Sequence, residues 1–200
     1  MQSNSEKFWN IPNIITFSRI LLALLVIILL WFLEAYKNNY YANIILSWTA
    51  AIFFIIASIS DYVDGYLARK YKIITDFGKL LDPIADKILV ISAIIMLIPL
   101  NRIAAWMAVI LISREITVTG IRAIAASEGV IISASSGGKL KTILLSIALG
   151  ALLIFHPINI LGIIIDAKLI GNVTLWLAFI VSVWSGASYS KNFIDEIAKK

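Results

Sequence analysis

Residues 44–60 read IILSWTAAIFFIIASIS, and residues 61–86 continue as DYVDGYLARKYKIITDFGKLLDPIAD. The first stretch is almost wholly apolar, as expected of a helix that lies in a lipid bilayer. The second stretch places four aspartates, at positions 61, 64, 82 and 86, at the ends of two apolar runs. Carboxylates are costly inside a membrane, so the two stretches together predict a helical membrane protein with a functional site where the runs meet.

The composition of the whole chain agrees with a membrane protein. Of 200 residues, 60% are hydrophobic and 14% charged, whereas average soluble domains are about half apolar and a quarter charged. Apolar runs of about 20 residues predict six spans, at residues 12–34, 42–70, 80–99, 104–126, 139–158 and 170–190. The expected fold class is therefore all-α, a six-transmembrane-helix bundle forming one domain over residues 1–200.

Three smaller features of the sequence limit what kind of protein this can be. Phe8 and Trp9 adjoin Lys7, a pattern that favours a short N-terminal interfacial segment, with a disordered tail as the alternative. The chain has no cysteine, which excludes disulfides and thiolate chemistry. The net charge of +5 requires no nucleic-acid partner.

Lysine and arginine are distributed unequally between the two ends of the expected helices. If the N-terminus is cytoplasmic, eleven of them lie on the inner side or at inner helix ends, and three lie on the outer side, Lys37, Arg102 and Lys168. Cytoplasmic loops carry the excess of positive charge in membrane proteins. We therefore expect a multi-pass protein of the cytoplasmic membrane, with both termini and the aspartates toward the cytoplasm.

Acidic and small residues share one face on each of two consecutive helices. They recur at i, i+3, i+4 and i+7 on the first helix and at i, i+4 and i+8 on the second: Asp61, Asp64, Gly65 and Ala68, then Gly78, Asp82 and Asp86. Four carboxylates that converge would repel one another unless cations neutralise them. All-oxygen ligands favour Mg²⁺, Mn²⁺ or Ca²⁺, and two such ions near Arg69 would bind phosphoryl oxygens.

Two other interpretations of the aspartates remain open at this point. They are an ion or proton pathway through the membrane, or polar contacts between helices. Against a pathway, the four acids lie toward one face of the membrane, and the outer halves of the spans carry no matching chain of ionisable groups.

The spacing Asp61-x2-Asp64-Gly65-x2-Ala68-Arg69-x8-Gly78-x3-Asp82-x3-Asp86 resembles, at every defined position, the signature of the CDP-alcohol phosphatidyltransferase family. The resemblance implies a six-span homodimeric enzyme in which an alcohol attacks a CDP-linked lipid and CMP leaves. It also implies two divalent cations, Mg²⁺ or Mn²⁺, held by Asp61, Asp64 and Asp82. Asp86 would be the general base and would also contact a metal. The implied CDP-lipid site adds small residues, one cation and two polar residues of the first span to Asp61 and Asp64: Gly65, Ala68, Gly78, Arg69, Asn13 and Thr16.

The flanking segments resemble the bacterial members of this family whose acceptor is sn-glycerol 3-phosphate and whose lipid donor is CDP-diacylglycerol. They are NIPNIITFSR at 10–19, REITVTGIRAIAASEG at 114–129 and GGKLKT at 137–142. Family members with inositol phosphate, serine or phosphatidylglycerol as acceptor are the alternatives within the family, and an ion-coupled transporter is the alternative outside it.

Four cations are candidates for binding the acceptor's phosphate. Two lie on the fourth expected span and two at the start of the fifth: Arg114, Arg122, Lys139 and Lys141. Arginine offers a planar fork to phosphate and lysine a point charge. Their alternative role is to anchor the inner helix ends, with side chains that extend to the interface. Arg19, inside the first span, would either pair with a motif aspartate or extend to the interface in the same way.

Overall fold

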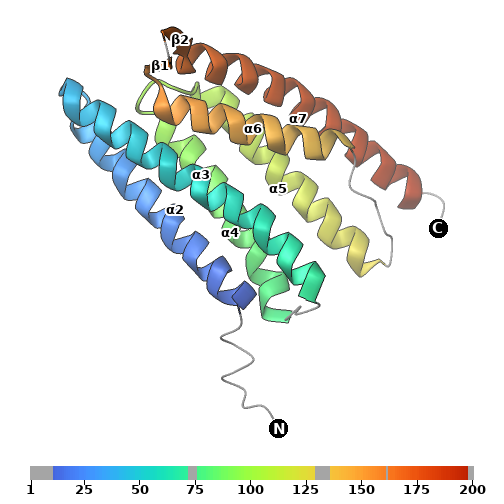
Figure 1. The fold of residues 1–200 in the computed structure, drawn as a ribbon. Helices are drawn as coiled ribbons and strands as arrows, with labels where there is room; N and C mark the ends of the chain where they lie inside the picture. The colour runs from blue at the N-terminus through green and yellow to red at the C-terminus, as the bar shows by residue number, and fades with distance from the viewer. Residues whose placement is uncertain (1–10, 72–75, 129–135, 161, 198–200) are drawn as a thin grey trace.

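The computed structural model describes residues 11–71, 76–128, 136–160 and 162–197; at 11–16, 61–71, 76–83, 86, 126, 136, 160 and 197 it describes the backbone alone. Within these ranges the chain forms six helices and one β-hairpin (Figure 1). The elements in chain order are α2 (Ile11–Ala35), α3 (Tyr40–Tyr71), α4 (Asp76–Leu97), α5 (Ala105–Ser127), α6 (Ser136–Ile154), β1 (Pro157–Ile160), β2 (Ile163–Asp166) and α7 (Ala167–Ile197).

The helices follow the apolar runs of the sequence, because a helix satisfies its backbone N–H and C=O groups internally where no water is present. Four of the described helices contain a stretch long and apolar enough to cross a membrane: Phe17–Ala35, Tyr40–Ser60, Gly137–Ile154 and Ala167–Glu196. The all-α membrane fold is thereby confirmed. The count of six spans stays a prediction, since the apolar stretch found in α4 is only Lys87–Leu97 and α5 carries three charged side chains. The interfacial segment expected before residue 11 lies outside the described residues.

Polar side chains mark where two of the long helices begin. The Asn39 carboxamide oxygen accepts the Ala42 N–H at 3.1 Å just before α3, and the Asp166 carboxylate accepts the Leu169 N–H at 3.1 Å just before α7. Each bond satisfies a backbone donor that has no partner within the first turn of its helix. The connections before α3 and α7 are therefore defined by local capping.

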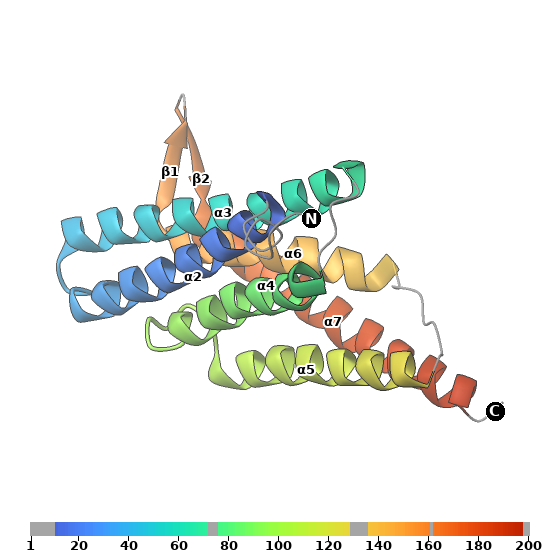
Figure 2. The same ribbon diagram turned by 90° about the horizontal axis from the view of Figure 1, so that it is seen from below.

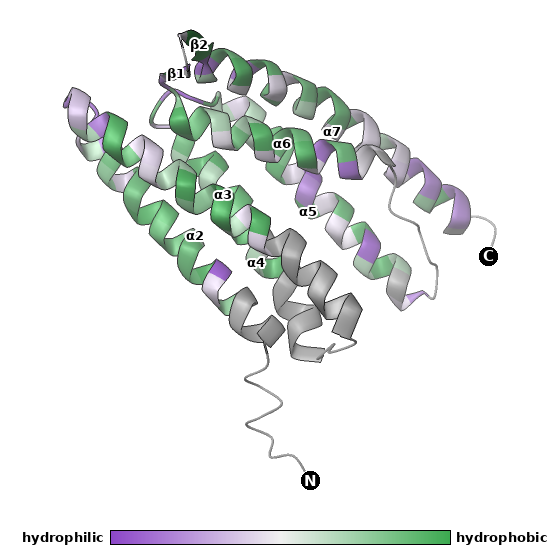
Figure 3. Ribbon diagram, in the orientation of Figure 1, coloured by the Kyte–Doolittle hydropathy of each residue, from purple (hydrophilic) through white to green (hydrophobic). Residues whose placement is uncertain are grey.

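The helices pack in two connected groups. α2 lies against both α3 and α4, while α6 lies against α7 and α3, and α7 is the main partner of α5 (Figures 1 and 2). The shared core is made of fully buried aliphatic and aromatic side chains, among them Leu30, Phe54, Leu89 and Leu149. Many large apolar side chains are also exposed on the outside of the helices, which suits a lipid environment. Hydrophobic residues, coloured green in Figure 3, predominate along most of the helices.

The β-hairpin is the main departure from the sequence expectation. The fifth span was expected to run to residue 158, but α6 ends at Ile154, Phe155 has a φ of 60°, and Pro157 begins β1. A positive φ at a bulky residue stops a helix, and proline cannot donate the next helical hydrogen bond. β1 and β2 pair antiparallel, and the Asn159 side chain accepts the Gly162 N–H at 3.1 Å in the turn.

Candidate active site

The aspartate motif occupies the facing ends of two consecutive helices. Positions 61–69 lie in the last part of α3, positions 78–86 lie in the first part of α4, and the connection between the helices is at residues 72–75. The backbone is helical over both stretches, so the face-sharing spacing predicted from the sequence applies to it. The side chains of Asp61, Asp64, Asp82 and Asp86 lie outside the described residues, as do those of Arg69 and Asn13.

The remaining residues of the predicted CDP-lipid site have the same status. They comprise Gly65, Ala68 and Gly78 of the motif and one polar residue of the first helix, Thr16. Residue 16 belongs to the early turns of α2, the helix that packs against both α3 and α4. All the helices that carry the motif and its predicted neighbours therefore belong to one packed group.

Arg19 is buried within that group. Its side chain is 1% exposed, the largest fully buried side chain of the described residues. A guanidinium that extended to the interface would be accessible, so this alternative for Arg19 is wrong. A charge at this depth needs polar partners, and pairing with a motif carboxylate stays the prediction for Arg19.

A connected polar network joins α5, α6 and α7. The Arg114 Nε donates to the Ser182 carbonyl at 3.1 Å and its Nη2 donates to the Ser185 hydroxyl at 2.9 Å. Its Nη1 lies 3.4 Å from Glu115 Oε2, the same oxygen that accepts from Lys141 Nζ. The side chains of Arg114 and Lys141 are 13% and 6% exposed, so both charges are held inside the protein by partners.

Two glycines allow the close approach of helices that this network requires. A Cβ at Gly186 would lie 3.0 Å from Arg114 Cγ, and a Cβ at Gly137 would lie 3.0 Å from Ser185 Cβ. Both distances are tighter than ordinary carbon contacts. Glycine at these two positions therefore lets α7 approach α5 and α6 closely enough for Arg114 to reach the α7 backbone.

The other two predicted acceptor cations lie apart from the network. Arg122, two turns further along α5, is exposed and its guanidinium carbon lies 5.9 Å from the centre of the Tyr189 ring. Lys139 is exposed at the start of α6. The structure therefore brings Arg114 and Lys141 together through Glu115, and leaves Arg122 accessible toward the end of α5 and Lys139 accessible at the start of α6.

Sequence reasoning missed a second polar cluster at the opposite end of the bundle. Arg102 is 5% exposed; its Nη1 donates to the carbonyls of Leu152 and Leu153 at 3.1 and 2.8 Å, and its Nη2 donates to the Ser47 hydroxyl at 2.9 Å. His156 Nε2 lies 2.9 Å from the Asn43 side-chain oxygen. The available signal was the single arginine in the short loop between two apolar runs, because an arginine side chain can hydrogen-bond the last carbonyls of a helix.

The described residues contain no group of three or more histidine, cysteine, aspartate or glutamate side chains that could hold a metal ion. The four motif aspartates are not among the side chains that this statement covers. Their all-carboxylate donor set fits hard divalent cations such as Mg²⁺ or Mn²⁺ and lacks the nitrogen and sulfur ligands that favour zinc or copper.

Comparison with known proteins places this arrangement in a family. The chain is 44% identical over 145 residues, 72% of both chains, to the CDP-diacylglycerol--glycerol-3-phosphate 3-phosphatidyltransferase of Bacillus subtilis. It is 38% identical to the Rickettsia typhi protein of the same name, over 91% of this chain and 96% of that one. It is also 32% identical to a probable phosphatidylglycerophosphate synthase of Mycobacterium tuberculosis, over 94% and 83% of the two chains. Residues 9–184 match the family described as CDP-alcohol phosphatidyltransferase, and the chain belongs to that family.

Proposed function

We propose that the chain is a phosphatidylglycerophosphate synthase, which transfers the phosphatidyl group of CDP-diacylglycerol to sn-glycerol 3-phosphate and releases CMP. The observation that carries this proposal is the complete aspartate motif, from Asp61 to Asp86, on two consecutive helices of a family member. Its similarity to relatives named for this reaction supports the choice of acceptor.

The aspartates would hold the metal ions that this chemistry uses. Asp61, Asp64 and Asp82, with a contact from Asp86, provide the oxygen ligands for two divalent cations, Mg²⁺ or Mn²⁺. When bound, such a pair neutralises the charge on the diphosphate oxygens and stabilises the attacking and leaving oxygens of a displacement at phosphorus. Gly65, Ala68 and Gly78 keep the space beside the carboxylates free for the nucleotide.

The reaction is a displacement in which one bond forms and one breaks. The acceptor's hydroxyl oxygen attacks the β-phosphorus of CDP-diacylglycerol, and the bond from that phosphorus to the bridging oxygen of CMP breaks. Asp86 takes the proton from the attacking hydroxyl, and CMP leaves with the bridging oxygen. A positioned base contributes on the order of 10²- to 10⁴-fold to such a step.

The acceptor's phosphate would bind at the inner ends of α5 and α6. Arg122 and Lys139 are exposed there and supply accessible positive charge. Arg114 and Lys141 add positive charge from within the network, where Glu115 and the α7 backbone hold them in position. A cationic site suits a phosphorylated acceptor, such as glycerol 3-phosphate or inositol phosphate, better than serine. Of these two acceptors, the relatives named for glycerol 3-phosphate favour glycerol 3-phosphate.

The distribution of charge supports one orientation of the protein in the membrane. Eleven lysines and arginines at one end of the bundle and three at the other favour a cytoplasmic location for the aspartate end. CMP and glycerol 3-phosphate would then exchange with the cytosol, and the lipid would enter from the inner leaflet. The family resemblance also implies a homodimer.

The test is CMP release from CDP-diacylglycerol by the purified protein in lipid or detergent, with a panel of acceptors. We expect release with sn-glycerol 3-phosphate and much less with inositol phosphate, phosphatidylglycerol or serine. Release that depends on another acceptor would keep the family chemistry and overturn the acceptor assignment. Ion flux across vesicles without CMP release would instead support the transporter alternative.

A further inference from the structure

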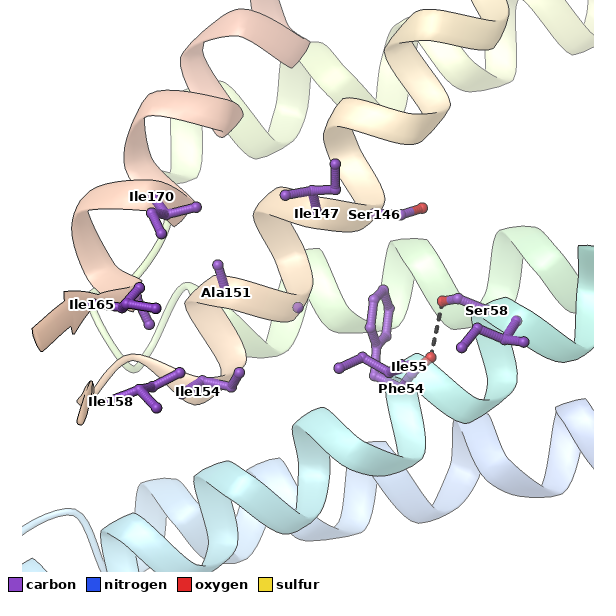
Figure 4. A pocket seen from close by; sticks show the side chains of 13 residues that line it. Phe54, Ile55, Ser58, Ser146, Ile147, Ala151, Ile154, Ile158, Ile165 and Ile170 are labelled. Atoms are coloured by element: carbon purple, nitrogen blue, oxygen red, sulfur yellow. Dashed lines mark hydrogen bonds between the residues drawn. The ribbon is translucent and has the colours of Figure 1, made fainter. Parts of the chain in front are cut away.

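An apolar groove runs along the outside of the bundle between α3 and α6. It has a volume of about 390 Å³, and its lining comes from α3, α6, both strands of the hairpin and the start of α7 (Figure 4). Eleven of its thirteen lining residues are apolar or glycine, and the other two are Ser58 and Ser146. The Ser58 hydroxyl donates to the Phe54 carbonyl of its own helix at 2.9 Å. The groove therefore suits a hydrocarbon chain rather than a polar ligand.

One end of the groove leads to the aspartate motif. Phe54 and Ser58 line the groove on α3, and position 61 follows them at i+7 and i+3, on the same side of the helix. On α6, Ser146 lines the groove and Lys139 precedes it by seven residues, two turns toward the inner end. Both walls of the groove therefore continue into the proposed catalytic and acceptor sites.

The hairpin closes the other end of the groove. Ile158 and Ile165 are directly paired across the two strands, and both side chains line the groove. Figure 4 shows them together with Ile154 and Ile170 at the end away from Ser58. Ile164, the neighbour of Ile165 on β2, is not among the lining residues and is 72% exposed. One face of the hairpin thus forms an end wall.

This end wall follows directly on the end of α6, which Arg102 holds through hydrogen bonds. Arg102 binds the last carbonyls of α6 and the Ser47 hydroxyl of α3, so it ties together the two helices that form the groove. On α6 the lining residues from Ser146 to Ile154 span about 12 Å of helix at 1.5 Å per residue. The groove is therefore a track of limited length. The aspartate motif lies beyond one end of it, and the hairpin, next to the helices that Arg102 joins, forms the other end.

We propose that this groove holds one acyl chain of CDP-diacylglycerol and that the Ile158–Ile165 pair limits the length of chain that fits. This inference rests on the proposed function. Because the surrounding lipid is as apolar as the groove, burial alone gives little preference, and selection comes from shape. A chain longer than the track must bend out of it or displace the hairpin, and overpacking of this kind costs at least about fivefold in affinity.

The test compares CMP release across CDP-diacylglycerols of increasing saturated chain length. The double variant Ile158→Ala/Ile165→Ala opens the end wall, so we expect its relative rate on the longest chains to rise by at least about fivefold over the wild type. Ile164→Ala is the control for the substitution at Ile165: it shortens the neighbouring isoleucine on the exposed face of β2, and its chain-length profile should equal that of the wild type.

A second variant tests the groove from its middle. A Cβ at Gly150 would make an ordinary 3.8 Å contact with Ile55 Cγ1, so α6 accepts a side chain there. Gly150→Leu would fill the track and should shift the preference toward shorter chains. Gly120→Leu is its control, because a Cβ at Gly120 meets nothing within 4 Å.

The outcomes separate this inference from the proposed function. Active wild type with the same chain-length profile in the double variant and in Gly150→Leu overturns the acyl-chain inference alone. If the double variant does not fold, an unshifted profile in Gly150→Leu is sufficient to overturn it. Wild type that releases no CMP at any chain length overturns the proposed function and this inference with it.

Discussion

At the scale of single residues, charge and burial explain the role of Arg102 in this helix bundle. Arg102 is buried, which lowers its pKa to about 10, so it keeps its charge at neutral pH. Its partners are carbonyls at the C-terminal end of α6, where the helix dipole favours a cation. The charge is thus tolerated because it binds backbone groups that have no partner within the helix.

The position of His156 beside Arg102 predicts that the stability of the protein depends on pH. Burial and the positive charge of Arg102 lower the pKa of His156 below its usual value of about 6.5. The unfolded chain then binds a proton more readily than the folded one, so stability should fall as the pH drops below about 6.5. His156 is the only histidine. His156→Gln should therefore remove this part of the pH dependence when melting temperatures are measured between pH 5 and pH 8. Identical slopes in both proteins would contradict the prediction.

The roles proposed for the motif aspartates predict two different effects of substituting them. Asp61→Asn and Asp82→Asn each replace a proposed charged ligand, so metal affinity and turnover should fall together. Asp86→Asn should lose on the order of 10²- to 10⁴-fold in turnover while keeping CDP-diacylglycerol binding and much of the metal affinity. Metal titration and nucleotide-lipid binding, measured beside CMP release, distinguish the two. Loss of lipid binding in Asp86→Asn as complete as in Asp61→Asn would show that the base and ligand roles are wrongly divided.

Chelation tests the metal centre without any mutation. Removing divalent ions should abolish CMP release by the wild type, and Mg²⁺ or Mn²⁺ should restore it, because the four carboxylates need counter-charge. Full turnover in excess chelator would refute the metal centre.

At the scale of elements, the network of Arg114, Glu115 and Lys141 connects helices that are distant in sequence. Arg114 holds α5 to α7, and the ion pair between Glu115 and Lys141 holds α5 to α6. α5 makes few other contacts with α6. The network therefore positions the cationic ends of α5 and α6 relative to each other, on the side where the acceptor is proposed to bind.

This arrangement predicts different effects for substitutions of the two arginines of α5. Arg114→Ala removes hydrogen bonds to the α7 backbone and to Ser185, and should cost roughly 2–4 kcal/mol of stability as well as acceptor binding. Arg122→Ala removes an exposed side chain, so it should raise the KM for glycerol 3-phosphate with little change in melting temperature. The measurements are thermal unfolding and acceptor kinetics on both variants. If Arg122→Ala retains normal acceptor dependence, the phosphate site lies nearer Lys139 and Lys141.

At the scale of the whole molecule, the residues proposed for the chemistry and the buried Arg102 cluster lie at opposite ends of the bundle. The aspartate motif lies where α3 ends and α4 begins, and the accessible cations lie toward the end of α5 and at the start of α6. The Arg102 cluster and the hairpin lie at the opposite end of the bundle. A site that exchanges water-soluble substrates opens to one side only, so the orientation in the membrane decides which compartment supplies glycerol 3-phosphate.

The absence of cysteine from the chain makes this orientation directly measurable. Single cysteines at Lys37 or Lys168 should react with a membrane-impermeant maleimide added to intact cells. Cysteines at Lys139 or Lys191 should react only after the membrane is opened. Each variant serves as the control for the others, because all carry one exposed lysine replaced by cysteine. Labelling of the second pair in intact cells would reverse the proposed topology.

The sequence alone determined the helices and the placement of the motif. The runs at 42–70 and 104–126 became α3 and α5 with ends shifted by no more than two residues. Apolar backbone in a bilayer has few alternatives to a helix, and helical periodicity then sets which motif positions share a face. These features are local, so they leave a periodic signal in the sequence.

Only the tertiary structure decided which distant groups meet. The end of α6 at Ile154, the hairpin that follows and the pairing of Glu115 with Lys141 were not foreseen, and the burial of Arg19 decided between the two alternatives that the sequence left open. Arg102 and the carbonyl of Leu152 are separated by fifty residues, and their contact arises only when α3, α4 and α6 are packed together. Such contacts leave no periodic pattern, because their energy depends on the geometry of several helices at once rather than on the spacing within one.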